Sequence, residues 1–155
     1  MAEGIEEVNN LIPVHSMWDG FWISDFTGEN LYIGCSFDKI SYRNFDIIFY
    51  GVIFYNLPAE WWDTDIRGDK LFFHGNIDAF LEQNPGFEIQ GKNLYELHLT
   101  TTPINAPAVT NTFYVVADTI YAEKCLAGDN RPNRVYNDPL SNFPYPNFRN
   151  RVLNL

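Results

Sequence analysis

The sequence has few cysteines and no long hydrophobic run, and each shortage excludes a class of protein. Its two cysteines, Cys35 and Cys125, are too few for a disulfide-stapled scaffold and too far apart for a paired zinc or redox motif. We expect both thiols to be buried and reduced. The longest stretch free of charged or strongly polar residues, Ile47 to Tyr55, has nine residues, whereas a membrane-spanning helix needs about 20. The sequence therefore predicts no transmembrane span.

Basic residues are also scarce. Lysine and arginine number 10 against 20 aspartates and glutamates, so the formal net charge is -10. Residues 131–155 carry four arginines and one aspartate, which gives that segment +3 and leaves -13 for residues 1–130. An acidic body repels phosphate backbones, so we expect no nucleic-acid partner. The same field attracts a basic protein and speeds its association.

The hydrophobic share of 46% and the aromatic share of 17% exceed what a disordered acidic chain carries. We expect a single domain over residues 1–155, with a core over about 11–125 and a frayed, acidic start. Residues 126–155 hold four prolines and many asparagines, and we expect them to form an irregular tail packed on the body. The start is acidic where a secretory signal would be basic and then apolar, which predicts a cytoplasmic protein.

Alternating apolar residues predict a mainly β domain. The strongest signal is Phe45 to Leu57, which is apolar on both faces and is expected to form one central strand, with Gly51 at a bulge or a close backbone approach. Further strands are expected at 31–37, 95–99 and about 112–125, and Asn76 is expected to cap one short helix. The segment from Trp18 to Phe26 fits a helix or a strand equally well. The predicted fold class is α+β, mainly β: an antiparallel sandwich or a strongly curved sheet with one short helix.

No catalytic or metal motif is readable. Asp63, Asp65, Gly68 and Asp69 resemble the start of a calcium loop, but Arg67 and His74 occupy positions that should bind the ion, so we expect solvated turn carboxylates and no cofactor. The histidines, at positions 15, 74 and 98, share no metal-ligand spacing. One of these histidines could still belong to a catalytic group that is assembled only in the folded chain. Three hypotheses for the function therefore remain: a protein-binding module, a small-ligand or carbohydrate-binding β domain, and an enzyme without a readable motif.

The partner-binding hypothesis centres on a turn-rich acidic segment. Trp61 and Trp62 are adjacent, so on a strand they point to opposite faces and one should be more exposed than the other. An exposed tryptophan ringed by carboxylates suits a basic partner, because tryptophan is enriched at binding hot spots. The candidate contact residues are Glu60, Trp61, Trp62, Asp63, Asp65 and Asp69.

Two segments carry a resemblance to a known group of proteins. They are FDIIFYGVIFYNLP, from Phe45 to Pro58, and FYVVADTIYAE, from Phe113 to Glu123. A central strand with a Phe-x-Gly-Val step and an aromatic closing strand, in a small acidic β domain, resembles the immunity proteins of bacterial polymorphic toxin and contact-dependent inhibition systems. The resemblance implies a cytoplasmic protein that binds a cognate toxin domain and blocks its active site or its access to substrate. It assigns no individual residue a role.

Overall fold

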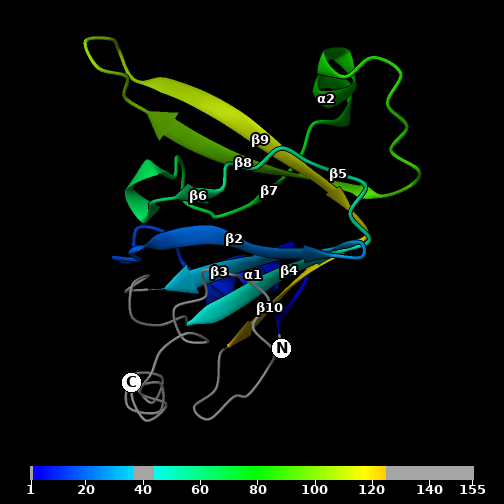
Figure 1. Ribbon diagram of the computed structural model, residues 1–155, viewed down its shortest axis with the longest axis horizontal. Coiled ribbons are helices and arrows are strands. Elements are labelled where there is room, and N and C mark those ends of the chain that lie inside the picture. Colours follow the sequence, from blue (N-terminus) through cyan, green and yellow to red (C-terminus); the bar gives the residue numbers. More distant parts are fainter. Residues whose placement is uncertain (1, 37–43, 125–155) are drawn as a thin grey trace.

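The computed structural model describes residues 2–36 and 44–124, and these form two antiparallel β-sheets stacked one above the other (Figure 1). The six-stranded sheet contains, in spatial order, β1 (Ala2–Glu3), β10 (Thr119–Lys124), β4 (Phe45–Tyr50), β3 (Asn30–Ser36), β2 (Gly20–Thr27) and β6 (Glu60–Trp61). The four-stranded sheet contains β5 (Phe54–Tyr55), β9 (Val109–Ala117), β8 (Asn93–Thr101) and β7 (Phe73–His74). The helices within these ranges are α1 (Ile5–Leu11), α2 (Ile77–Gln83) and the 3-10 turn η1 (Asp63–Asp65). The predicted mainly β, sandwich-like α+β fold is confirmed.

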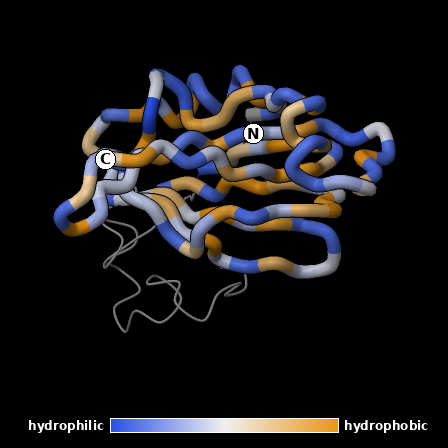
Figure 2. The backbone as a smooth tube through the Cα atoms, turned by 90° about the horizontal axis from the view of Figure 1, so that it is seen from above, coloured by the Kyte–Doolittle hydropathy of each residue, from blue (hydrophilic) through white to orange (hydrophobic). Residues whose placement is uncertain are grey.

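The main core lies between the two sheets. It combines buried residues of the six-stranded sheet, such as Leu31, Ile33 and Phe49, with Leu97 and Val115 of the four-stranded sheet. Figure 2 shows hydrophobic and polar residues alternating along the strands. A smaller cluster forms where α2 packs on the other face of the four-stranded sheet, through Phe80, Leu94, Tyr114 and Val116. Each sheet therefore contributes one face to the shared core, as strand alternation requires.

Two expected long strands are each divided between the sheets, which corrects the prediction of continuous strands at Phe45 to Leu57 and at about 112–125. The first becomes β4 and β5, with a bend after Gly51; the second becomes β9 and β10, with a break at Asp118. The two crossings lie side by side, because the Asp118 amide donates to the Tyr50 carbonyl at 2.8 Å. The first run is apolar on both faces partly because Phe49 of β4 and Tyr55 of β5 face the core from different sheets. Within β4 itself, Ile48 on the opposite face is also buried.

The expectation of a frayed start is wrong. The edge strand β1 pairs with β10, and α1 follows with Ile5 and Val8 buried in the main core together with Ile12. These residues recur every three or four positions and so form one apolar helix face. The acidic side chains of this segment occupy the exposed positions between them.

The other local predictions have mixed outcomes. Asn76 caps α2 by accepting a hydrogen bond from the Ala79 amide at 3.0 Å, as expected. Of the two alternatives left open for Trp18 to Phe26, the strand is correct, since β2 covers most of that segment. Cys35 is buried, as expected. Cys125 and the tail 126–155 lie outside the described residues.

Candidate functional site

Residues 60–70, the corner segment, join the two sheets along one side of the sandwich. Strand β6 pairs with β2 at the edge of the six-stranded sheet, with Trp61 opposite Phe21. A few residues later, Ile66 forms a β-bridge with Leu99 of β8 in the four-stranded sheet. The corner segment is therefore attached to regular strands at its start and again at Ile66, which makes the backbone between these points a rigid support for the side chains it exposes.

Two predicted site carboxylates stabilise this corner from within. Asp63 is 3% exposed, and its Oδ1 accepts a hydrogen bond from the His15 amide at 2.9 Å. Asp65 Oδ2 accepts from the Trp62 amide at 3.0 Å. The His15 ring is also tied to the corner, with Nε2 2.9 Å from the Gly68 carbonyl oxygen. The expectation of solvated turn carboxylates is therefore wrong for Asp63, which is buried because it satisfies a backbone donor of the neighbouring loop.

The tryptophan pair divides between the interior and the surface, as the strand argument predicts. Trp61 is 2% exposed and stacks on Phe21, with ring centroids 5.6 Å apart and an interplanar angle of 9°. Trp62 is 49% exposed. The corner segment thus presents one large aromatic side chain to solvent on a backbone fixed by Asp65.

The charges around Trp62 are mixed. Glu60 and Asp69 are exposed and Asp65 is half-buried, but Arg67 and Lys70 are exposed as well. Arg67 Nη1 donates to the Thr110 hydroxyl at 2.9 Å, so its guanidinium is directed toward β9. Of the six predicted contact residues, the structure leaves four with solvent-accessible side chains: Glu60, Trp62, Asp65 and Asp69.

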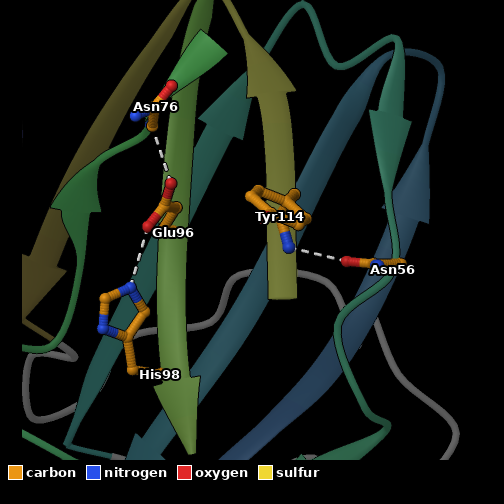
Figure 3. Close-up of polar contacts among 5 residues, drawn as sticks. All are labelled: Asn56, Asn76, Glu96, His98 and Tyr114. Atoms are coloured by element: carbon orange, nitrogen blue, oxygen red, sulfur yellow. Dashed lines mark hydrogen bonds and ion pairs between the residues drawn. The ribbon is translucent and has the colours of Figure 1, made fainter. Parts of the chain in front are cut away.

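A polar cluster on the outer face of the four-stranded sheet involves one of the three histidines (Figure 3). His98 Nε2 lies 2.8 Å from Glu96 Oε1, and Glu96 Oε2 accepts from the Asn76 amide at 2.8 Å. Phe73 stacks on the His98 ring at a centroid distance of 4.9 Å. Within the described ranges, Glu96 is the one hydrogen-bonding partner of the His98 side chain, so no serine or cysteine is placed beside it as a nucleophile. The Glu96 contacts orient the β7–α2 connection against β8.

A surface hollow of about 350 Å³ lies between α1 and β7. Its lining combines aromatic residues with charged and amide groups: Ile5, Glu6, Asn9, Asn10, Lys70, Phe72, Phe73 and His74. A second open hollow adjoins it and adds Glu3 and Glu7. Sequence reasoning missed this region because it took the first residues as frayed; the spacing of Ile5, Val8 and Ile12 was the signal that predicts the helix.

No group of three or more histidine, cysteine, aspartate or glutamate side chains is placed to hold a metal ion in residues 2–36 and 44–124. In the same ranges, neither α-helix has the length and hydrophobicity needed to cross a membrane. Comparison with protein-family models, with curated proteins and with solved structures found no match to this chain.

Proposed function

We propose that this protein is a non-catalytic binding module that neutralises a basic protein partner, a bacterial toxin domain being the candidate that the sequence resemblance suggests. The observation that carries the proposal is the exposure of Trp62 on a corner whose backbone is fixed to both sheets. A large aromatic side chain on a rigid support loses little conformational entropy when it is buried by a partner. The acidic net charge of the chain supports association with a basic surface.

The proposed contact surface consists of Trp62 with the carboxylates of Glu60, Asp65 and Asp69. Trp61 and Asp63 support this surface from the interior, because both are almost completely buried. Exposed carboxylates at the rim of an interface act mainly on the association rate, whereas a buried aromatic anchor acts mainly on dissociation. The two groups of residues therefore have separable kinetic signatures.

The alternative is a small-ligand or carbohydrate-binding domain, and the hollow beside α1 is the observation in its favour. Its volume of about 350 Å³ lies within the range of ligand pockets. However, the hollow is open, and Glu6 and Lys70 stand among its lining residues, whereas ligand pockets are predominantly apolar and enclosed. We therefore place the protein-binding function first.

The test begins with capture from the source organism at low salt, with the full chain as bait. We expect a basic protein to bind the parent chain and to be lost when the bait carries Trp62→Ala. The purified partner is then used for binding kinetics at two salt concentrations. Trp62→Ala should raise Kd about 30-fold, mostly through faster dissociation, since an anchor of this kind contributes about 2 kcal/mol.

Matched variants separate the anchor from the charges. Glu60→Gln and Asp69→Asn should slow association and weaken its salt dependence, while Asp78→Asn, the same neutralisation on α2, should change neither. Phe26→Ala removes another exposed aromatic residue, 45% accessible on β2, and should leave dissociation unchanged. Folding of each variant is checked by circular dichroism. A captured partner that binds all folded variants as it binds the parent would contradict the proposed surface.

A further inference from the structure

The far half of the β8–β9 hairpin extends beyond the rest of the body (Figure 1). Every residue from 101 to 112 is exposed. Strand β5 pairs with β9 only at Val115 and Val116. The first residues of β9 therefore pair with β8 on one edge and with no strand of the described ranges on the other. The opposite edge of β9 is open from Val109 to Phe113.

The backbone groups at this open edge can be identified from the last residue that is covered. Tyr114 donates its amide to Asn56 Oδ1 at 2.6 Å (Figure 3) and accepts from the Asn56 amide at 3.1 Å. Alternate residues of a strand direct their N–H and C=O groups to the same edge. Thr112 and Thr110 therefore direct theirs to the open edge, and within the described ranges these four groups have no hydrogen-bonding partner.

We propose that a second copy of this chain covers this edge, with β9 paired antiparallel to β9 across a two-fold axis at Asn111. In that register Thr110 lies opposite Thr112 of the second copy, and Thr112 lies opposite Thr110. The two copies then exchange four backbone hydrogen bonds, which satisfy all eight open N–H and C=O groups. The four-stranded sheets join into one continuous sheet of eight strands.

The same register brings compatible side chains together. Val109, which is 46% exposed, lies opposite Phe113 of the second copy, and the symmetric pair repeats this contact. An aromatic residue opposite a β-branched residue is a favourable cross-strand pair. The other face joins Thr110 with Thr112 of the second copy, and the symmetric pair repeats this contact. The paired positions themselves are uncharged, and the neighbouring charge that contacts them in the described part of the chain is the exposed Arg67, whose guanidinium donates to the Thr110 hydroxyl at 2.9 Å.

The charge pattern favours a second copy over the basic partner proposed for the corner segment. Residues 97–117 contain no aspartate, glutamate, lysine or arginine, although the chain as a whole carries -10. Two identical acidic bodies repel each other, and an uncharged projecting hairpin is the part through which they can meet with the least repulsion. Exposed edges commonly carry a charge or a proline that blocks pairing, and Val109 to Phe113 carries neither.

Sedimentation velocity of the full chain, from micromolar to millimolar concentration, tests the proposal. We expect a reversible monomer–dimer equilibrium. Thr112→Pro removes one outward N–H per copy and none of the hydrogen bonds between β8 and β9, so it should raise the dimer dissociation constant at least about tenfold. Asn111→Lys sets two like charges opposite each other and should do the same. Thr101→Lys, an equal charge change on the exposed end of β8, should leave the equilibrium unchanged.

A cross-link tests the register itself. In a Cys125→Ser background, Asn111→Cys should form a disulfide-linked dimer on oxidation, because directly opposite residues of antiparallel strands lie within disulfide distance. Thr101→Cys should not. A chain that stays monomeric at every concentration, or one that pairs only with a strand from another protein, would overturn the proposal. Asn111→Lys changes an exposed side chain and should leave the fold intact even if Thr112→Pro does not. A dimer that Asn111→Lys leaves unaffected would therefore also overturn the proposal.

Discussion

Replacing Gly51 by alanine tests the corner at which β4 leaves the six-stranded sheet. Gly51 has a φ of +64°, a left-handed conformation that disfavours any residue with a β-carbon. A β-carbon there would also overlap Asp118 Oδ2, which lies at the crossing from β9 to β10. Gly28 has the same φ of +64° with no atom within 4 Å of its β-carbon position. The two glycines therefore share the backbone strain and differ in the space available.

The expected magnitudes follow from that comparison. The left-handed conformation costs about 1–2 kcal/mol for a residue with a β-carbon, at either position. At Gly51 the Asp118 carboxylate must also move from Lys92 Nζ, 3.0 Å away. Because this carboxylate ends an exposed side chain, it can rotate away, and a strained rotamer adds about 0.5–1.5 kcal/mol. The ion pair itself contributes little, because the Asp118 side chain is 60% exposed. Gly28→Ala should thus lower the free energy of unfolding by about 1–2 kcal/mol and Gly51→Ala by about 1.5–3.5 kcal/mol.

Guanidinium chloride unfolding of both variants measures the difference directly. The excess at Gly51 should largely disappear in an Asp118→Ala background, because the overlapping carboxylate is gone, while the backbone strain remains. Gly51→Val, with its two further methyl groups, should lower the melting temperature more than Gly51→Ala. If Gly51→Ala proved no more destabilising than Gly28→Ala, the close approach of the two sheet crossings would be refuted.

Two further predictions concern α1 and the core. The Asn9 side chain donates to the Phe72 carbonyl at 2.9 Å and accepts from the Phe72 amide at 3.1 Å. Asn9→Asp removes the donor and should lower the free energy of unfolding by about 1–3 kcal/mol. Asn10→Asp introduces the same charge at an exposed neighbouring position and should change the free energy of unfolding little in the same denaturation assay. Burial, together with the charge of Asp118, raises the pKa of Tyr95 above its ordinary value. The unfolded state then releases the phenol proton more readily than the folded state, so the free energy of unfolding should fall as pH rises above about 10. The free energy of unfolding of the Tyr95→Phe variant should fall less over the same pH range. The denaturant midpoints of the parent chain and of Tyr95→Phe are compared at pH 8 and at higher pH. Equal shifts of the two midpoints would contradict this prediction.

The class of fold was predictable from the sequence because each strand's pattern is local. Alternating burial of Tyr95, Leu97 and Leu99 on β8 is visible directly in the sequence, and so is the Asn76 cap. The division of the two long apolar runs was not predictable, because a run that is apolar on both faces fits either one buried strand or two strands that face the core from different sheets. Gly51 predicted either a bulge or a close backbone approach, and the residue that lies against it, Asp118, is distant in sequence.

The candidate site was predictable to a similar degree. Adjacent tryptophan side chains on an extended backbone point to opposite faces, so the exposure of one of them was predictable from the sequence. Which of the two is exposed depends on the pairing of β6 with β2 and was not predictable. The burial of Asp63 depended on the His15 loop, 48 residues away in sequence. Side chains whose environment is set by a distant loop carry no local signal, and carboxylates in such a segment look alike until the chain is folded.

The uncharged hairpin shows how sequence and structure combine where neither is sufficient alone. The absence of charge over residues 97–117 is typical of a buried strand pair, and on its own it predicts burial. The structure instead exposes residues 101–112, because β5 ends at Tyr55 and the hydrogen bonds of the next residue, Asn56, reach only Tyr114. Thr110 and Thr112 are therefore left uncovered. A strand with the composition of an interior strand and the position of an edge strand is stabilised when another strand covers it. In a chain of net charge -10, we therefore propose different occupants for the neutral hairpin and for the Trp62 corner: a second acidic copy at the former and a basic protein at the latter.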